Sequence, residues 1–312
     1  MLSRVANSLF WQARYLERGE TTARFLAVTH GYAQELRSVS HAAGDRCWGV
    51  ARQLFAGAEA PEEDGRATFR RLALDRELGT SMLASIALAR ENARGIRDAI
   101  PSEMWEELNV LYLLLLESAD APPSEAGELS LLERVKAVGQ SLQGLRDSTM
   151  VRADEWHFLR LGQFQERASI SLRILDEMVS HPALWEAAEV GQSIDTLHLA
   201  ATLRAFTAFE AFSRAGHSLT LERAAEFLLL DGRFPRSVEF GIQELASSLH
   251  VLSGTPQDIF SNDAEQLCGR LLAELRFASI EEIISQGLHE YLLRLLGRVE
   301  QLAGMIGQLY FP

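Results

Sequence analysis

Arginine side chains and aromatic rings recur at helical spacing near the N-terminus. Arg14 and Arg18 are four residues apart, so they share one face of a helix. Trp11, Tyr15 and Phe25 point into the same broad sector. Guanidinium groups in such a sector can stack on the rings and donate paired hydrogen bonds to an acid group. The pattern therefore favours a polar cleft whose arginines hold a carboxylate or a phosphate.

Two glutamates stand on the sectors beside these arginines. Glu17 and Glu20 are three residues apart, and Glu20 and Arg24 are four apart, so each pair is close enough to interact. In a cleft, such a glutamate would orient an amine or act as a general base, which makes Glu17 and Glu20 catalytic candidates. The alternative is an ion-pair network that only fixes helix packing, because the pattern contains no dedicated nucleophile.

A second polar group follows in residues 90–112. Arg90, Arg94 and Arg97 share one face of a predicted helix, and Glu91 lies within reach of Arg94. We expect this group to lie opposite the first helix, with Glu91 as a third catalytic candidate. An exposed, salt-bridged helix surface is the alternative. The other polar and aromatic candidates of this group are Asn92, Trp105, Asn109 and Tyr112.

Two segments of the chain resemble each other. Residues 14–24 align without gaps with residues 163–173, so that the pair Glu17-Arg18 matches the pair Glu166-Arg167. An aromatic residue stands two positions before each glutamate. These matches predict an internal duplication, in which two helical units pack with approximate two-fold symmetry and each motif faces its counterpart.

A third candidate lies at a turn that leads into a helix. Arg236 and Ser237 follow Pro235, whose place in the first helical turn leaves free backbone N–H groups beyond it. A helix N-terminus that carries arginine is a credible anion site, and an ordinary helix start is the alternative. In the predicted duplication, Arg236 corresponds to Arg94.

Almost the whole chain is predicted to be helical, because breakers are few and no alternating β-branched run is long enough for a strand. The expected fold is all-α, a helical bundle of two similar halves without a sheet. Residues 1–120 are expected to form the first repeat, 121–150 a linker and connecting helix, and 151–312 the second repeat. The expected helices cover residues 3–35, 81–99, a stretch from 101 onward, 129–147, 153–179, 194–215, 220–230, 236–252, 263–276 and 279–309.

The composition argues against several classes of protein. The 312 residues carry a net charge of −13, which is the wrong sign for a generic nucleic-acid binder and for an anionic membrane surface. Cys47 and Cys268 form neither a disulfide framework nor a zinc signature, and no histidine has the spacing of a di-iron bundle. No metal is therefore expected. The N-terminus lacks the apolar stretch of a signal peptide, which favours the cytoplasm.

Several motifs occur in an order that resembles one bacterial family. Residues 1–6, 10–24, 89–97, 105–109 and 226–238 are similar to the successive signatures of alpha-E proteins. The resemblance implies an all-helical protein of largely uncharacterised function. It also implies a gene beside, or fused to, that of a circularly permuted ATP-grasp ligase, often accompanied by a transglutaminase-like protein.

The resemblance suggests a part in ATP-dependent amide or peptide bond formation, and three hypotheses follow. In the first, the chain is a helical partner of the ligase, and its Arg/Glu cleft binds a small carboxylate, a peptide or a phosphorylated substrate. ATP is then bound only by the ligase, and no intrinsic cofactor is expected. In the second, the chain is itself an enzyme on amide or peptide bonds with a glutamate base. In the third, it is a scaffold with ion-pair networks only.

The candidate site combines the residues of these motifs. The predicted catalytic residues are Glu17, Glu20 and Glu91. The predicted substrate-binding residues are Arg4, Arg14, Arg18, Arg24, Asn92, Arg94, Asn109, Tyr112, Glu166, Arg167, Arg236 and Ser237. In the second copy, Gln163, Phe164 and Ser169 stand where the family-like pattern has an arginine, a tyrosine and an acid. We therefore expect the first copy to carry the active cleft.

Overall fold

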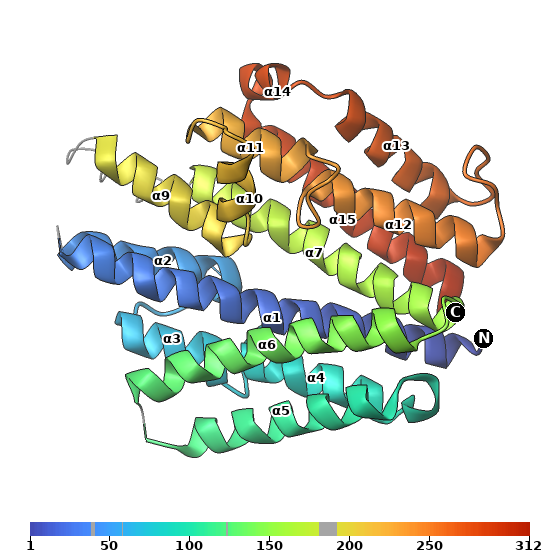
Figure 1. Cartoon of the computed structure of the whole chain (residues 1–312), viewed down its shortest axis with the longest axis horizontal. Helices are drawn as coiled ribbons and strands as arrows, with labels where there is room; N and C mark the ends of the chain where they lie inside the picture. The colour runs from blue at the N-terminus through green and yellow to red at the C-terminus, as the bar shows by residue number, and fades with distance from the viewer. Residues whose placement is uncertain (39–40, 58, 123, 181–191) are drawn as a thin grey trace.

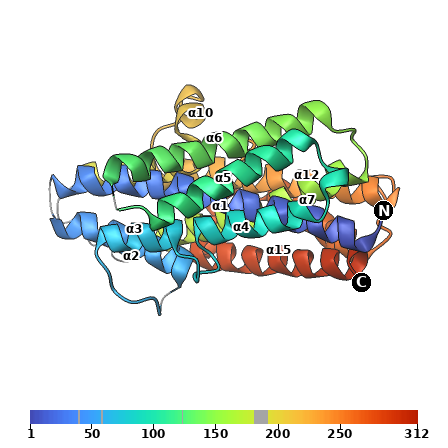
Figure 2. The ribbon, with the colours of Figure 1, turned by 90° about the horizontal axis from the view of Figure 1, so that it is seen from below.

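The computed structural model describes residues 1–38, 41–57, 59–122, 124–180 and 192–312. The described residues form helices and no β-strand, so the predicted all-α fold is confirmed. The two halves of the chain occupy opposite sides of one helical bundle (Figure 1). The long helices run roughly along the length of the bundle (Figure 2). No helix among the described residues is long and apolar enough to cross a membrane.

The first half is organised around α1 (Ser3–Arg37), a helix of 35 residues. Both α4 and α6 pack against α1, and α5 packs against α4 and α6 in turn. Two shorter helices, α2 and α3, also contact α1. The bounds are α2 (His41–Ala56), α3 (Gly65–Leu74), α4 (Met82–Arg94), η1 (Arg97–Ala99), α5 (Ser102–Asp120) and α6 (Glu125–Thr149).

The second half repeats this packing order around α7 (Asp154–Ser180). Both α12 and α15 pack against α7, and α13 packs against α12 and α15. The bounds are α9 (Gln192–Ala205), α10 (Phe209–Arg214), α11 (Leu221–Leu230), α12 (Val238–Ser253), α13 (Asp263–Phe277), α14 (Ile280–Gln286) and α15 (Leu288–Tyr310). The internal duplication and the predicted domain boundaries stay predictions, although the two packing orders correspond.

The two halves meet mainly where α1 crosses α7. The backbones come close there, because a Cβ atom on Gly162 would lie 2.0 Å from the carbonyl oxygen of Phe10. The buried part of α1 is unusual, since Gln12, Glu17 and Glu20 are buried beside apolar core residues. Helix α1 therefore carries polar groups into the interior, and these groups need partners there.

Two turns, one in each half, have the same hydrogen bonds. Between α3 and α4, the hydroxyl of Ser81 donates to the carbonyl oxygen of Asp75 at 2.6 Å, and Ser81 caps α4. Between α11 and α12, the hydroxyl of Ser237 donates to the carbonyl oxygen of Asp231 at 2.7 Å, and Ser237 caps α12. In both turns the aspartate carboxylate accepts from the backbone N–H two residues further on.

The predicted match of Arg94 with Arg236 is wrong. Arg94 is the last residue of α4, whereas Arg236 precedes the first turn of α12, so the two lie at opposite ends of comparable helices. The matching turns pair Arg236 with Thr80 instead. Four-residue similarities are too short to define the register of a duplication, whereas the shared cap geometry favours the pairing of Ser81 with Ser237.

The predicted helix 81–99 divides into α4 and the short η1 at Gly95 and Ile96. Two predicted helices of the second half are also interrupted. Residues 194–215 divide into α9 and α10 at Thr207, whose φ of 55° is rare for a β-branched residue. Residues 279–309 divide into α14 and α15 at Gly287, whose φ is 104°. A glycine marks the break at Gly287 in the sequence, but neither glycine nor proline marks the break at Thr207.

Candidate functional site

The Glu-Arg pairs of α1 and α7 exchange partners across the interface between the halves. Glu17 accepts hydrogen bonds from Nε of Arg167 at 2.7 Å and from Nη2 at 2.8 Å. In return, Glu166 accepts from Nε of Arg18 at 2.6 Å and from Nε of Arg14 at 2.9 Å. Each glutamate therefore binds arginine of the other long helix, as the predicted facing of the two motifs requires.

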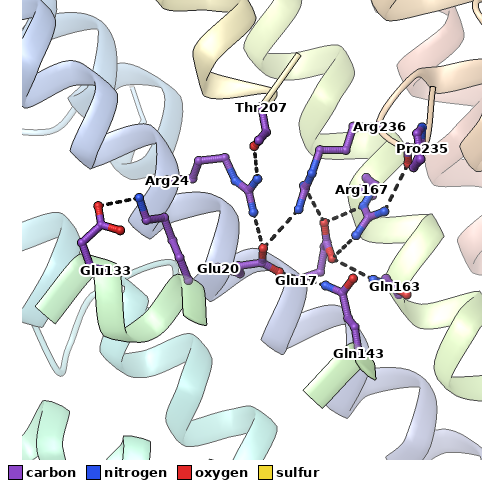
Figure 3. Close-up of polar contacts among 11 residues, drawn as sticks. Glu17, Glu20, Arg24, Glu133, Gln143, Gln163, Arg167, Thr207, Pro235 and Arg236 are labelled. Atoms are coloured by element: carbon purple, nitrogen blue, oxygen red, sulfur yellow. Dashed lines mark hydrogen bonds and ion pairs between the residues drawn. The ribbon is translucent and has the colours of Figure 1, made fainter. Parts of the chain in front are cut away.

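Arg236 and Arg24 extend this exchange around the two glutamates of α1 (Figure 3). Nη2 of Arg236 donates to Glu20 at 3.1 Å, and Nη1 lies 3.4 Å from Glu17. Arg24 donates to Glu20 and to the hydroxyl of Thr207. The side chains converge from α1, from the joint between α9 and α10, and from the turn before α12.

Neutral amides complete the hydrogen bonding of the glutamates. Gln143 of α6 donates to Glu20 at 3.0 Å, and Gln163 of α7 donates to Glu17 at 3.3 Å. We refer to the charged side chains together as the Glu/Arg cluster. Its members are Arg14, Glu17, Arg18, Glu20, Arg24, Glu166, Arg167 and Arg236.

The centre of the Glu/Arg cluster is buried, Arg14, Arg18 and Arg236 are half-buried, and the cluster carries excess positive charge. Glu17 and Glu20 are 2% and 0% exposed, and Arg167 and Arg24 are 5% and 6% exposed. Five arginines face three glutamates, so the formal sum is +2 inside a chain whose net charge is −13. Buried charge is costly unless it is paired, so an excess of this kind leaves positive charge without a matching carboxylate among the members of the cluster.

The pKa shifts follow this imbalance. Burial opposes ionisation of Glu17, but the charge and hydrogen bonds of Arg167, and then the charges of Arg236 and Arg24, lower the pKa of Glu17 to about 2. Burial, followed by the charges of Arg167 and Arg24, lowers the pKa of Arg236 to about 10 despite the nearby glutamates. Glu17 is thus held firmly as a carboxylate, while Arg236 is a cation with too little negative charge around it.

Aromatic rings support the arginines, as the sequence predicts. The guanidinium of Arg18 lies 5.4 Å from the ring centre of Tyr15, and that of Arg167 lies 5.1 Å from the ring centre of Phe164. Arg14 lies 4.8 Å from the ring of Trp11. The stacking holds the guanidinium groups in place between the two long helices.

A groove of about 460 Å³ opens beside the Glu/Arg cluster, between α1, α6 and α9. Its volume is within the range of small-molecule sites. Arg24 belongs both to the cluster and to the wall of the groove, and its Nε has no hydrogen-bond partner among the described residues. The lining comprises Arg24, Ala27, Val28, Gly31, Tyr32, Glu35, Glu133, Lys136, Ala137, Gln140, Ala201, Arg204 and Thr207.

Sequence reasoning missed four charged residues of this groove, namely Glu35, Glu133, Lys136 and Arg204. Arg204 of α9 stacks on Phe209 with 4.9 Å between the guanidinium and the ring centre, and forms no ion pair with a described residue. Glu35 of α1 is exposed and likewise has no described cation as a partner. Lys136, the one lysine of the sequence, pairs with Glu133 at 2.6 Å. Arg204, Glu35 and Lys136 belong to no motif, and only the packing of three separate helices brings them together.

The second predicted polar group does not join the site, which corrects the expectation that it faces the first helix. Glu91 and Arg94 are exposed and pair with each other, and Asn92 donates to the carbonyl oxygen of Leu88 at 2.8 Å. Helix α4 turns a different face toward α1, with Ile86 and Ala89 among its buried residues. The polar positions fall on the outer side of the same helix.

The remainder of this group forms a separate surface on α4 and α5. Nε of Arg90 donates to Asn109 at 2.8 Å. The guanidinium of Arg90 lies 4.9 Å from the ring of Tyr112 and 5.3 Å from that of Trp105. The alternative of an exposed helix surface describes these residues better than the predicted cleft.

Two further predicted residues have other surroundings. Arg4 lies exposed in the first turn of α1, away from the cluster members further along that helix. Ser237 is buried and caps α12, where its hydroxyl accepts from the backbone N–H of Phe240 at 3.1 Å. Ser237 therefore positions the turn that carries Arg236, and its hydroxyl is already bonded on both sides.

The described residues contain no group of three or more histidine, cysteine, aspartate or glutamate side chains placed to hold a metal. Both cysteines are buried, and burial raises the pKa of the Cys47 and Cys268 thiols to about 12. Neither thiol is therefore an activated nucleophile.

Comparison with known proteins identifies the family of the chain. A family model described as a predicted alpha-helical domain with a conserved ER motif, named Alpha-E, matches residues 1–311. The chain belongs to the Alpha-E family. Uncharacterized proteins of Mycobacterium bovis and of two strains of Mycobacterium tuberculosis are each 25% identical to it over 322 residues. The matched region covers 95% of this Alpha-E chain and 35% of the length of each relative. No solved structure matches it.

The ER motif has a clear structural place in this Alpha-E chain. The sequence contains Glu-Arg pairs at 17–18, 133–134, 166–167 and 222–223. The pairs 133–134 and 222–223 are exposed, whereas the pairs 17–18 and 166–167 form the reciprocal exchange between α1 and α7. The catalytic and substrate-binding roles predicted for the residues of the Alpha-E site stay predictions.

Proposed function

We propose that this Alpha-E protein is a helical binding partner, without a metal, of an ATP-grasp-type amide or peptide ligase. Its groove receives a carboxylate or phosphoryl group of the substrate at the end lined by Arg24 and Arg204. The observation that carries the proposal is the excess of arginine over glutamate in a buried cluster that reaches the groove through Arg24. In this proposal the ligase, and not this chain, binds ATP. Because ATP is used in the cytoplasm, we also propose that the chain is located there.

Electrostatics supports an anion as the ligand. The Glu/Arg cluster has two more cations than anions, and Arg204 adds a cation without an ion-pair partner among the described residues at the edge of the groove. An anion beside Arg24 and Arg204 would offset this excess. The attraction between an arginine and a bound anion is stronger near a buried cluster than at an open surface, because water screens it less there.

The surroundings of Glu17 favour binding over general-base chemistry at that residue. A base works best when its pKa is near the operating pH, whereas the pKa of Glu17 is about 2. The carboxylate is also occupied by Arg167 and Arg236 and is 2% exposed. In our proposal Glu17 and Glu20 hold the arginines in position, and the ligase supplies the chemistry.

The length of the relatives supports a function that this region carries out together with another protein or domain. This chain spans about a third of the length of the curated relatives it matches, so the homologous region there is joined to further protein. An Alpha-E unit that prepares or presents a substrate fits such an arrangement. A transglutaminase-like protein is the second partner that we propose.

The proposal is tested by purification and kinetics. A tagged copy of the chain, purified from its own cells, is expected to carry with it an ATP-grasp ligase identified by mass spectrometry. ATP-dependent product formation by that ligase is then measured with the wild-type chain, with Arg204→Ala and with Arg134→Ala as a matched exposed control on α6. We expect Arg204→Ala to reduce the rate about fivefold or more and the control to leave it unchanged. A ligase that is fully active without the chain overturns the proposal, and product formed by the chain alone supports the stand-alone enzyme instead.

A further inference from the structure

The groove beside the Glu/Arg cluster has a positive end. Arg24 donates to Thr207, which fixes the last turn of α9 beside Arg24 of α1. Arg204 stands three residues before Thr207 and lines the same groove. Arg24 is neutralised by Glu20, but Arg204 has no described carboxylate as a partner. The cation of the groove that no described carboxylate neutralises, Arg204, is therefore located where α9 ends.

The opposite end of the groove is negative. Further along α1, the ring of Tyr32 lies 6.1 Å from that of His198, so α9 runs antiparallel to α1 and its earlier turns cover the later turns of α1. Glu35 lies one turn beyond Tyr32 and also lines the groove. Its carboxylate forms no ion pair with a described residue. The groove thus carries an unpaired cation near one end and an unpaired carboxylate near the other.

The separation of these ends sets the length of a matching ligand. Arg24 and Glu35 are eleven residues apart on α1, which corresponds to about 16 Å at the helical rise per residue. A single amino acid is far too short to join them. Arg204, one turn before Thr207 on the antiparallel α9, lies roughly 5 Å nearer to Glu35 than Arg24 does. An extended chain advances by about 3.4 Å per residue, so about four or five residues cover this distance.

The middle of the groove is lined by small or neutral groups. Ala27, Gly31, Ala137 and Ala201 leave room, and a Cβ atom on Gly31 would meet no other atom within 4 Å. Lys136 and Glu133 line the same stretch but neutralise each other. The floor therefore leaves space for an extended backbone between the two charged ends.

We infer that the groove binds a short, extended peptide with both ends charged. Its carboxylate lies at Arg204 and Arg24, and its protonated amino group lies at Glu35. This inference rests on the proposed function, because it specifies the ligand of the same groove. A ligand that carries only an anionic group would use Arg204 and leave Glu35 without a role.

Calorimetric titration with penta-alanine tests the charged ends. The free peptide is compared with its N-acetylated form and its C-terminal amide. We expect the acetylated and the amidated peptides each to bind about fivefold more weakly, since each loses one ion pair of a partly exposed kind. In Glu35→Gln the free and acetylated peptides should bind equally. In Arg204→Ala the difference between the free and amidated peptides should become smaller, since only Arg24 remains at that end.

A steric variant tests the location. Gly31→Leu fills the middle of the groove and should abolish peptide binding, whereas Gly144→Leu on the open surface of α6 is the matched control and should not. Thermal unfolding of both variants shows that the fold is retained. Equal binding of the free and acetylated peptides by the wild type, or no peptide binding at all, overturns the inference. If ligase activity still depends on Arg204 in that case, the proposed function stands and only the ligand class is wrong.

Discussion

Glu17 of α1 and Arg167 of α7 form a two-bond ion pair at the crossing of the long helices, and both side chains are buried. The pair is matched on the other side of the crossing by Glu166 and Arg18. A buried pair of this kind contributes less to net stability than its short distances suggest, because both charges lose their hydration. Removing one partner should be strongly destabilising, since the other charge then remains buried without its main partner.

The two arginines that contact Glu17 should therefore differ in their effect on stability. Arg167→Met leaves Glu17 with Arg236 at 3.4 Å and with Gln163, and should lower the free energy of unfolding by about 3–5 kcal/mol. Arg236→Met leaves Glu17 bound to Arg167 and Glu20 bound to Arg24, so the loss should stay below about 1.5 kcal/mol. Urea unfolding at pH 7 measures both. Equal losses would contradict the view that Arg236 is the surplus cation of the cluster.

Acid should destabilise the protein through Glu17. Its folded pKa of about 2 lies below the ordinary value of 4.5, so its contribution to stability is complete above about pH 5 and is lost as the pH falls toward 2. Glu17→Gln removes this contribution and should reduce the slope of the free energy of unfolding in that window by up to about 1.4 kcal/mol per pH unit. Glu166 keeps part of the slope, because its pKa is lowered too. The exposed Glu210, changed to Gln, is the control and should leave the slope as it is.

The central part of the site could be predicted from the sequence because it lies on single helices. Spacing within α1 places Arg14, Glu17 and Arg18 in one region, and the match of residues 14–24 with residues 163–173 supplies their partners. Helical periodicity fixes such relations without knowledge of the tertiary structure. The same reasoning failed for Arg94, because periodicity shows which residues share a face but not which face is buried.

The groove could not be predicted, because it is made by packing. Its walls come from α1, α6 and α9, and Glu35, Lys136 and Arg204 are each about 70 residues or more apart in sequence. No motif marks them, and the turn of the chain at Thr207 has no breaker residue that would indicate it. Contacts that arise only from the packing of separate helices leave no periodic pattern in a single sequence.

The crossing of α1 and α7 should depend on a glycine. Gly162→Ala would place its Cβ atom 2.0 Å from the carbonyl oxygen of Phe10, so the helices must move apart and disturb the Glu/Arg cluster. We expect the free energy of unfolding to fall by about 2 kcal/mol or more. Gly144→Ala, where a Cβ atom meets nothing within 4 Å, should instead raise it by about 0.5–1 kcal/mol. Chemical denaturation of the two alanine variants decides the matter, and a neutral Gly162→Ala would show that the helices pack less closely than described.

Thr207 should have a strained backbone and should contribute to stability through its hydroxyl, which accepts a hydrogen bond from Arg24. Its φ of 55° is unfavourable for a β-branched side chain, whereas asparagine adopts this conformation more readily. Thr207→Asn keeps an oxygen that accepts from Arg24 and should raise the free energy of unfolding by about 1 kcal/mol. Thr207→Val keeps the strain and removes the acceptor of a buried arginine, so it should lower the same quantity by about 1–2 kcal/mol. Thermal and urea unfolding of the two variants measure the difference, and a valine variant as stable as the wild type would mean that the contact with Arg24 does not hold the joint between α9 and α10.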